Sequence, residues 1–560
     1  MLQRFTGVSR LSVIVSNTLG SFALFGLDSR FEGVFFTRGK QTFRTIAHIE
    51  GSGECGDFST EFWRARYKHG AFRSLWFAKR LPIFFFESKG SYDVLLDCRE
   101  NYDNRVWGRH YDVFEEEGMV YVHYEKRDDD REPVKGEYDF WLAFAGIDAG
   151  LSLEWVERNY SFDKERSSPP FSRWVFRAFR AKGSFVCAFG SSKWEVSRLA
   201  REGVERRLHL MREARVFSDD VVSRARFNWQ SRACAYSLLC LRSSDGLFAG
   251  LPWFHQRWAR DELISLKSFA RVGQVELSKA ILFSWLDKLS GVKMEGTLTR
   301  FIADSGWVFV RANDLWDFLS PSERLEVADR ARNFCKSVSE SLSSGLLFSG
   351  SKETWMDSLD RSGARVEIQA LALSAFKLLR ERGYSSKHLD SLEYDFKDSV
   401  VSSFWNGNYL KDGCDDPAIR PNLFIAAYVY PELLTKAQWR KCFSTALSRL
   451  WCEWGGLATI DVKSASFIGR HTGEDPASYH QGDSWYWLNN LSAIVLLSLG
   501  SSAQKRYAES IFNASSKEIL QGALGHHAEL SSAESLESRG CLAQAWSAAM
   551  YLELCELLKG

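Results

Sequence analysis

Residues 354–379, TWMDSLDRSGARVEIQALALSAFKLL, hold the pattern that decides the fold. From Val366 onward, apolar residues recur every three or four positions, which predicts a helix that faces a core. The preceding residues form a charged loop in which Asp357 directly follows two large apolar residues, Trp355 and Met356. A carboxyl group against apolar neighbours loses hydration, and this favours the protonated form that a general acid needs. The alternative for Asp357 is a helix cap or a surface turn.

This alternation of loop and buried helix continues through most of the chain. After about residue 218 the hydrophobic period is helical throughout. Twelve helices are expected, at about 220–242, 260–272, 275–288, 304–318, 321–344, 365–382, 385–403, 421–434, 436–449, 484–499, 502–522 and 541–558. Ser320-Pro321-Ser322-Glu323 supplies a capping box with proline at the first helical position. Twelve helices without a solenoid-length repeat predict six hairpins closed in a ring, an (α/α)6 barrel.

The first third of the chain has a different pattern. Short runs rich in β-branched and aromatic residues, such as LSVIVS, LPIFFFE, MVYVHY and SFVCAFG, are separated by Gly, Asp, Asn and Ser. Such runs are typical of an antiparallel β-sandwich. We therefore expect a β-sandwich domain over 1–190, a charged helical linker over 191–217 and the helical barrel over 218–560.

Composition excludes several classes of protein. The 560 residues carry a formal net charge of +1 without blocks of like charge, which argues against a nucleic-acid partner. No apolar run is long enough to span a bilayer and no signal peptide is recognisable, so no membrane association is expected. The eleven cysteines are scattered without a CxxC pair, which favours a reducing, cytoplasmic location over a disulfide framework or a zinc site. The aromatic share of 14% suits ligands with apolar C–H faces, as sugars have, although a large core would also explain it.

Loops at one end of a ring of hairpins converge, so a site should draw residues from several of them. In LPWFHQRWARDELISL, Arg260 and Asp261 offer a donor fork and an acceptor for a sugar hydroxyl, or else a helix-end ion pair. Asp304, in RFIADSGWVFV, is by itself best explained as a helix cap. YHQGDSWYWLNNL places His480 with other polar and aromatic groups at a helix entrance, which suits a sugar subsite, although a lone buried histidine is more often structural.

The loop before the last helix contains three glutamates, Glu529, Glu534 and Glu537. Each by itself is best explained as a solvated side chain. No Gly-rich phosphate loop, GxSxG or HExxH motif is present. Acids, aromatics and amides in the loops between helices are what glycoside hydrolysis requires: one carboxylic acid to protonate the leaving oxygen and one carboxylate to activate water.

At these loops the sequence resembles the amylo-α-1,6-glucosidase family, which is related to the glucoamylase-like (α/α)6 hydrolases. The matching pieces occur in the order of the family: PWFHQRWARD, IADSGWVFV, TWMD with RVEIQAL, RPNLFIA, GGLATI, YHQGDSWYW and RGCLAQAWS. IVSNTLGSFALFGLDSRFEGVFF also resembles the start of the β-sandwich that precedes the catalytic domain in archaeal and bacterial members. The family's WGRD is WARD here, with Ala259 in place of glycine.

The resemblance implies roles for individual residues. Asp357 matches the proposed general acid, and Trp355 and Met356 would then dry the cleft around it. Glu529 best matches the general base, with Glu534 as the alternative because this loop is shortened. The implied substrate-binding residues, some of them indicated by the loops alone, are Arg260, Asp261, Trp258, Asp304, Trp355, Glu367, His480, Gln481 and Trp485.

The function implied is an exo-acting, inverting glycoside hydrolase that releases glucose from α-1,6 branch points of a glycogen-like α-glucan or limit dextrin. Inversion places the two carboxyl groups ~6.5–9.5 Å apart, and this chemistry needs no metal or organic cofactor. The alternatives are an α-1,4-glucosidase or disaccharide hydrolase on the same scaffold, and a non-catalytic glucan-binding protein.

Overall fold

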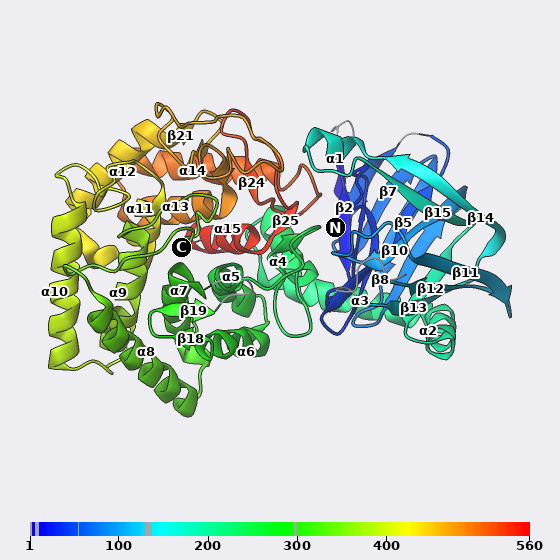
Figure 1. Ribbon diagram of the computed structural model, residues 1–560, viewed down its shortest axis with the longest axis horizontal. Coiled ribbons are helices and arrows are strands. Elements are labelled where there is room, and N and C mark those ends of the chain that lie inside the picture. Colours follow the sequence, from blue (N-terminus) through cyan, green and yellow to red (C-terminus); the bar gives the residue numbers. More distant parts are fainter. Residues whose placement is uncertain (1–2, 6–10, 54, 129–135, 296–299, 560) are drawn as a thin grey trace. The chain divides into compact units, whose positions relative to one another are not determined.

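The computed structural model of the chain describes residues 3–5, 11–53, 55–128, 136–295 and 300–559. It divides into two compact units (Figure 1). The first consists of Met1–Ser223, Leu239–Ser244 and Leu520–Gly525, and the second of Arg224–Leu238, Asp245–Ile519 and His526–Gly560. Among the residues so described, no helix is both long and apolar enough to cross a membrane.

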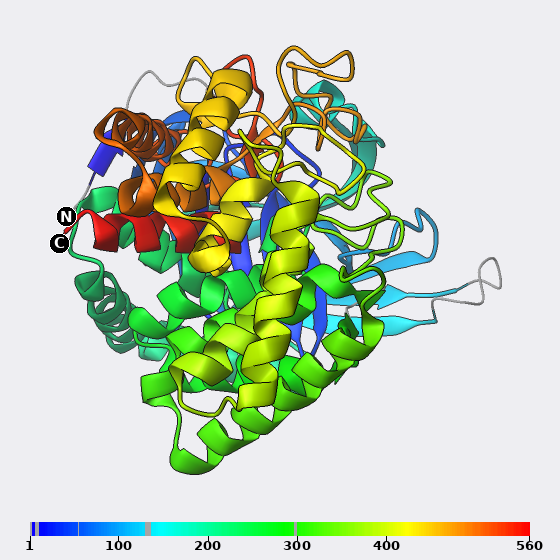
Figure 2. The ribbon, with the colours of Figure 1, turned by 90° about the vertical axis from the view of Figure 1, so that its left-hand side faces the viewer.

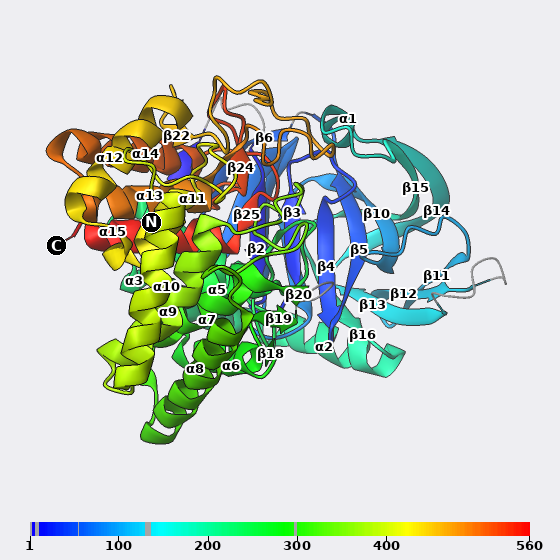
Figure 3. The ribbon, with the colours of Figure 1, turned by 60° about the vertical axis from the view of Figure 1, so that its left-hand side comes forward.

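The first unit contains two antiparallel sheets. The larger sheet has the strand order β1 (Gln3–Phe5), β6 (Cys55–Thr60), β7 (Arg64–His69), β8 (Ala71–Phe77), β9 (Ile83–Ser88), β16 (Phe185–Gly190), β13 (Tyr138–Ala145), β12 (Met119–Lys126) and β11 (Arg109–Glu116). The smaller sheet has the order β14 (Asp148–Asn159), β15 (Ser172–Lys182), β10 (Ser91–Glu100), β5 (Gln41–Glu50), β4 (Gly33–Arg38), β3 (Phe22–Phe25) and β2 (Val13–Ser16). Figure 3 shows β5, β4, β3 and β2 of the smaller sheet side by side.

Aromatic side chains join the two sheets. Phe36 of β4 stacks on Phe189 of β16 with ring centroids 5.1 Å apart. Phe144 of β13 meets Phe179 of β15 edge to face at 5.0 Å. Such rings bury a large apolar area and pack in specific geometries, so they define a core between the sheets. The antiparallel sheets predicted from the strand pattern are thereby confirmed.

The charged segment after the sheets forms two helices where one was expected, α2 (Lys193–Glu205) and α3 (Arg207–Arg224). Helix α2 packs on strands β16, β13 and β9. Its contact is close, because a Cβ atom built on Gly203 would lie 2.6 Å from a methyl carbon of Val186. This helix therefore covers a sheet. A short helix, α1 (Ser161–Glu165), precedes β15.

The second unit is helical, and the twelve predicted helices are confirmed. They are α4 (Trp229–Cys240), α5 (Ala259–Arg271), α6 (Val275–Leu286), α7 (Ile302–Asp314), α8 (Pro321–Ser341), α9 (Val366–Glu381), α10 (Lys387–Phe404), α11 (Asn422–Val429), α12 (Lys436–Leu450), α13 (Tyr486–Leu499), α14 (Ser502–Glu518) and α15 (Ala545–Leu557). Figure 2 turns this unit toward the viewer, with α10 in yellow-green at the front. The predicted capping box of Ser320 and Glu323 is present at the start of α8.

The first of these helices begins later than predicted. The hydrophobic period suggested a start near residue 220, whereas α4 begins at Trp229. The cause is a local cap, since Asn228 Oδ1 accepts a hydrogen bond of 2.6 Å from the Ser231 main-chain N–H. A side chain that satisfies an unpaired N–H group of the first turn fixes the start of a helix.

Six helices form a closed cycle of contacts. Helix α5 packs on α7, α7 on α9, α9 on α11, α11 on α13, α13 on α15, and α15 on α5 again. Nearly every residue of α9 and α15 is buried, as expected for helices with neighbours on all sides. Of the remaining helices, α6, α8, α10, α12 and α14 each contact members of the cycle.

Two short ladders tie together the segments that lead into the helices of the cycle. Strand β17 (Gly250–Leu251) pairs with β25 (Ala543–Gln544), and β23 (Ser484–Trp485) pairs with β24 (Leu530–Ser531). The helices α5, α13 and α15 therefore begin close to one another. The other short elements are β18 (Leu289–Ser290), β19 (Lys293–Glu295), β20 (Arg300–Phe301), β21 (Trp451–Cys452), β22 (Gly456–Leu457) and the 3-10 turns Trp316–Phe318 and Pro431–Leu433.

Candidate active site

A cavity of about 170 Å³ lies where α5, α13 and α15 begin. Seven of the residues predicted from the sequence line it: Trp258, Arg260, Asp261, Trp355, Asp357, Trp485 and Glu529. Five further residues complete the lining: Ala249, Phe254, Tyr479, Gln544 and Trp546. The cavity thus combines carboxyl groups, one guanidinium group and several aromatic faces. This is the usual composition of a pocket for a polar ligand with apolar faces.

Glu529 has a hydrogen-bond donor on each of its carboxylate oxygens. It lies directly before β24, and its side chain accepts a hydrogen bond of 2.8 Å from the Cys541 main-chain N–H at Oε2. The Tyr479 hydroxyl donates to the other oxygen, Oε1. Gly540, with φ +66°, leaves room for this carboxylate, because a Cβ atom there would lie 2.3 Å from Oε2. Each oxygen therefore has a fixed donor and keeps acceptor capacity for a ligand.

Asp357 is held by Arg260. The Arg260 Nη2 group donates to Asp357 Oδ2, and the two residues come from α5 and from the loop before α9. The Asp357 side chain is 30% exposed, whereas that of Arg260 is 8% exposed. The apolar neighbours in sequence, Trp355 and Met356, are buried beneath the loop and leave Asp357 partly open to solvent. The drying expected from these two residues is therefore only partial.

Trp355 anchors the Asp357 loop in an aromatic cluster. Its ring stands perpendicular to those of Trp485 and Trp487, at centroid distances of 5.4 and 5.2 Å. Its Nε1 group donates to Asn422 Oδ1 at 2.7 Å. Because neighbouring aromatic rings meet edge to face and the indole N–H is satisfied, this side chain is fixed in one orientation.

His480 and Gln481 do not line the cavity, although His480 contacts the lining residue Trp485. The His480 ring stacks on Trp485 at 5.1 Å, and its Nδ1 atom lies 2.7 Å from Ser358 Oγ. Burial, reinforced by nearby arginines, lowers the pKa of His480 well below its ordinary value. This imidazole is therefore neutral, and its contact is with the residue that follows Asp357. Gln481 accepts a hydrogen bond of 3.1 Å from Arg420.

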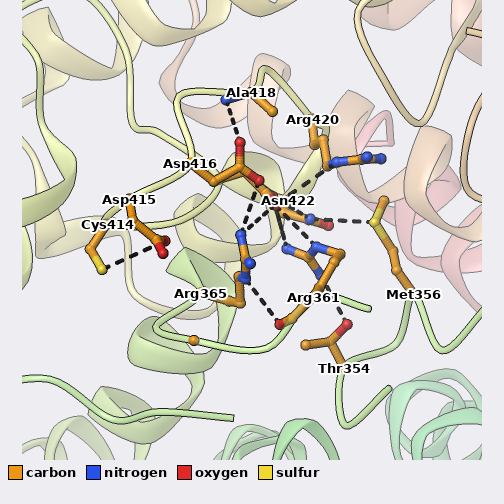
Figure 4. Close-up of polar contacts among 12 residues, drawn as sticks. Thr354, Met356, Arg361, Arg365, Cys414, Asp415, Asp416, Ala418, Arg420 and Asn422 are labelled. Atoms are coloured by element: carbon orange, nitrogen blue, oxygen red, sulfur yellow. Dashed lines mark hydrogen bonds and ion pairs between the residues drawn. The ribbon is translucent and has the colours of Figure 1, made fainter. Parts of the chain in front are cut away.

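Glu367 is also outside the cavity, in a buried charge network beneath the same loop. Arg361 Nη1 donates to Glu367 Oε1 at 2.6 Å, and Arg361 Nη2 contacts Asp412 at 2.8 Å. Arg361 also binds Thr354 Oγ1, and Asn422 reaches Asp412 and the Met356 sulfur (Figure 4). Glu367 was predicted to line a sugar subsite. In the structure it pairs with Arg361 and so stabilises the loop that carries Asp357.

Two buried acids flank Arg260. Asp261 Oδ1 accepts a hydrogen bond of 2.9 Å from Gln544 Nε2, and burial, with a contribution from the Glu529 charge, raises the pKa of Asp261 to about 8. Asp304, in the first turn of α7, does not line the cavity; burial raises its pKa to about 6, and the Asp357 charge adds to the rise. Arg260 lowers both pKa values. Its guanidinium group is thus a shared counter-charge for Asp357, Asp261 and Asp304.

The alternative acids are placed elsewhere. Glu534, the second candidate for the general base, is exposed and does not line the cavity. Asp360, three residues beyond Asp357, is exposed as well. Five lining residues escaped the sequence prediction, namely Ala249, Phe254, Tyr479, Gln544 and Trp546. All except Ala249 belong to the quoted motifs PWFHQRWARD, YHQGDSWYW and RGCLAQAWS, which identified these segments but did not show which of their residues line the cavity.

Comparisons with known proteins identify the family of the chain and structures of similar fold. Residues 237–553 match the profile of a family described as amylo-alpha-1,6-glucosidase. A bacterial glucoamylase complexed with acarbose is similar in structure over 100% of this chain and 97% of its own, with a TM-score of 0.63 and 10% identity, which establishes likeness of fold. A GH63 mannosylglycerate hydrolase from Thermus thermophilus, in complex with glucose, covers 58% of this chain and 99% of its own at a TM-score of 0.45 and 11% identity. No curated protein matches the sequence.

Proposed function

The chain belongs to the amylo-alpha-1,6-glucosidase family of glycoside hydrolases, and from this premise we propose that it is an exo-acting, inverting enzyme that releases glucose from α-1,6 branch points of a glycogen-like α-glucan. One observation carries the proposal: Asp357, Glu529 and the Arg260–Asp261 pair, which are distant in sequence, line a single cavity. An acid, a base and a group that binds hydroxyls are the parts this reaction needs.

In the proposed reaction Asp357 donates its proton to the glycosidic oxygen as the C1–O bond breaks. Glu529 removes a proton from a water molecule, whose oxygen forms the new bond to C1 from the opposite face of the sugar. The proton lost by Asp357 leaves on the alcohol product, and Glu529 gains one, so the two carboxyl groups exchange protonation states in each turnover. This route needs room for water between them, ~6.5–9.5 Å. The two donors on Glu529 support a fixed base, because a rigid acceptor aligns the attacking water.

We assign binding of the terminal glucose to Arg260 and Asp261. A guanidinium donor beside a carboxyl acceptor can engage neighbouring hydroxyl groups together. The aromatic faces of Trp258, Trp485 and Trp546 line the same cavity and suit the C–H faces of a sugar ring. Since Arg260 also contacts Asp357, a sugar bound by Arg260 would lie next to the proposed acid.

The same proposal covers architecture and location. We assign residues 218–560 to an (α/α)6 barrel, supported by the closed cycle of contacts from α5 through α15, with residues 1–190 as a β-sandwich domain and 191–217 as the segment between them. The scattered cysteines support a reducing, cytoplasmic setting.

The test is glucose release from two substrates side by side, a limit dextrin with single-glucose α-1,6 stubs and linear malto-oligosaccharides. Wild type is compared with Asp357→Asn and with a matched control, Asp360→Asn, whose side chain is exposed in the same loop. We expect release from the stubs, a loss of at least a thousandfold in Asp357→Asn, and wild-type rates in Asp360→Asn.

Other results would change the assignment. Release mainly from the linear chains would make the protein an α-1,4-glucosidase with the same catalytic pair. Equal binding of dextrin by wild type and Asp357→Asn, without release from any substrate, would make it a glucan-binding protein. Loss of activity in Asp360→Asn alone would remove Asp357 from the role of general acid.

A further inference from the structure

A large, positively charged pocket lies on the first unit, outside the candidate active site. It has a volume of about 480 Å³ and is formed by β10, β14 and β15 together with the segment 105–109. Arg99, Arg105, Arg109 and Arg173 line it, and Trp155 and Trp174 are also in its wall. None of these residues has a role in the proposed hydrolysis, so the pocket requires its own explanation.

Positive charge in this pocket exceeds negative charge among the described residues. Asp97 is shared by three arginines: its Oδ2 lies 2.5 Å from Arg44 Nη1 and 3.2 Å from Arg99 Nε, and its Oδ1 lies 3.2 Å from Arg109 Nη1. Arg105 is neutralised separately by Asp103 and Asp128. One carboxylate thus serves three guanidinium groups.

Arg173 forms no direct ion pair with a carboxylate in the part of the chain that the structure describes, and the Asp97 charge that acts on it is shared with the other arginines. Its polar contact is a hydrogen bond of 3.3 Å from Nη2 to Asn104 Oδ1, and its Nε is buried without a hydrogen-bond partner. The residue is 8% exposed. Burial, with repulsion from Arg99, lowers the pKa of Arg173 to about 9. Even with Glu157 counted, which lines the pocket and is exposed, the arginines outnumber the acids.

A buried guanidinium group without a direct ion pair is costly, because charges in protein interiors are normally paired. A ligand with at least one negative charge would supply the missing partner. Arginine binds phosphate and carboxylate groups through two parallel N–H donors, and it is the preferred residue for recognition of phosphate. The charge of this pocket therefore points to an anionic group, with phosphate as the best match.

The two tryptophans indicate what is attached to that anion. Trp155 is 40% exposed and Trp174 is 52% exposed, although large aromatic side chains are usually well buried. The Arg109 guanidinium lies 4.5 Å from the Trp155 ring centroid, and Arg109 Nη1 donates to the Trp174 main-chain carbonyl at 2.9 Å, so both residues lie beside the same arginine. Exposed aromatic faces beside arginines suit a ring with apolar faces that carries a negative group.

We propose that this pocket binds a phosphate ester of a sugar, with the phosphate against Arg173, Arg99 and Arg109 and the sugar ring against Trp155 and Trp174. The same chemistry is offered by a free sugar phosphate and by a phosphorylated unit within a glucan. The proposal concerns binding alone and does not depend on the hydrolytic function.

The test is titration calorimetry of the full chain with glucose 6-phosphate, inorganic phosphate, glucose, AMP and a phosphorylated maltodextrin. We expect glucose 6-phosphate to bind at least tenfold more tightly than inorganic phosphate, with no binding of glucose at the same concentrations. Tighter binding of the maltodextrin would identify a glucan as the source of the phosphate, and tighter binding of free glucose 6-phosphate would identify a metabolite. Tighter binding of AMP than of either would overturn the sugar part of the proposal.

Two variants locate the site. Arg173→Gln should weaken binding of phosphate and of glucose 6-phosphate at least tenfold. Trp174→Ala, at a half-exposed position, should weaken glucose 6-phosphate severalfold and leave phosphate unchanged. The matched control is Trp194→Ala, since Trp194 on α2 is 72% exposed and does not line the pocket. Wild-type affinities in both Arg173→Gln and Trp174→Ala, or absence of phosphate binding to the wild type, would overturn the proposal.

Discussion

Gly540 gives the sharpest test of the assignment of Glu529 as the general base. A Cβ atom at this position would lie 2.3 Å from Glu529 Oε2 and 2.9 Å from Cδ, whereas ordinary contacts begin near 3.4 Å. In Gly540→Ala the carboxylate must therefore move by about 1 Å. A displacement of that size at a catalytic group costs on the order of 10²-fold in rate.

The variant also carries a backbone cost, which needs a separate control. Gly540 has φ +66°, where alanine is disfavoured by ~1–2 kcal/mol. Gly383, just after α9, has φ +76° but no atom within 4 Å of a built Cβ. Gly383→Ala thus shares the backbone strain without the contact. Comparing the two variants separates loss of stability from displacement of the base.

The assay is kcat for glucose release from limit dextrin, with thermal unfolding of each variant measured in parallel. We expect kcat of Gly540→Ala to fall about a hundredfold, while Gly383→Ala stays within twofold of wild type at a similar loss of stability. A folded Gly540→Ala enzyme with kcat within threefold of wild type would refute the reasoning, because the position of Glu529 would then not matter. Equal loss of activity in both variants would attribute the effect to backbone strain.

Three further predictions concern the surroundings of the cavity. Tyr479→Phe removes a hydroxyl donor from a carboxylate, worth ~1.5–3 kcal/mol, so kcat should fall about 10- to 100-fold in the same assay; an unchanged kcat would contradict it. Arg361→Met removes the ion-pair partner of buried Glu367 and leaves Asp412 with Arg365 and Arg420 only, so it should lower the free energy of unfolding by ~3–5 kcal/mol in denaturant titrations, and a loss below ~1 kcal/mol would be inconsistent with the network. Burial raises the pKa of Asp261 from 3.8 to about 8, so the folded protein keeps a proton that the unfolded chain releases, and this contribution to stability is lost as pH rises from about 4 to 8. Asp261→Asn should therefore show a smaller fall of Tm over that range than wild type, and parallel Tm profiles would argue against it.

Periodicity predicted the helices well because burial decides them. The helix predicted over 365–382 is α9, Val366–Glu381. Neighbouring helices cover it on several sides, so apolar residues recur along it with a clear helical period. The sequence-based prediction failed where a single side chain fixes the boundary of a helix. Asn228 is an example, because it caps α4 and places the start of this helix at Trp229. Periodicity cannot register a single hydrogen bond of this kind.

The site was predicted in part, for a similar reason. Motifs identified the loops that converge, and Asp357 and Glu529 both line the cavity. Glu367 has a carboxyl group as Asp357 and Glu529 do, but it does not line the cavity. It pairs instead with Arg361, six residues earlier, because the path of the intervening loop brings the two side chains together. Sequence spacing does not reveal that path. The charged pocket of the first unit escaped entirely, since Arg99, Arg109 and Arg173 come from three different strands that are distant in sequence.

The central claim is that Asp357 and Glu529 act as acid and base on opposite faces of a terminal α-linked glucose. The most direct measurement is the anomeric form of the first glucose released by the wild type from limit dextrin, observed by proton NMR before mutarotation. Attack by water from the opposite face predicts free β-glucose as the first product. Initial release of α-glucose would contradict the account, because retention requires a carboxylate that bonds to the sugar and a separation of the two groups near ~5–5.5 Å.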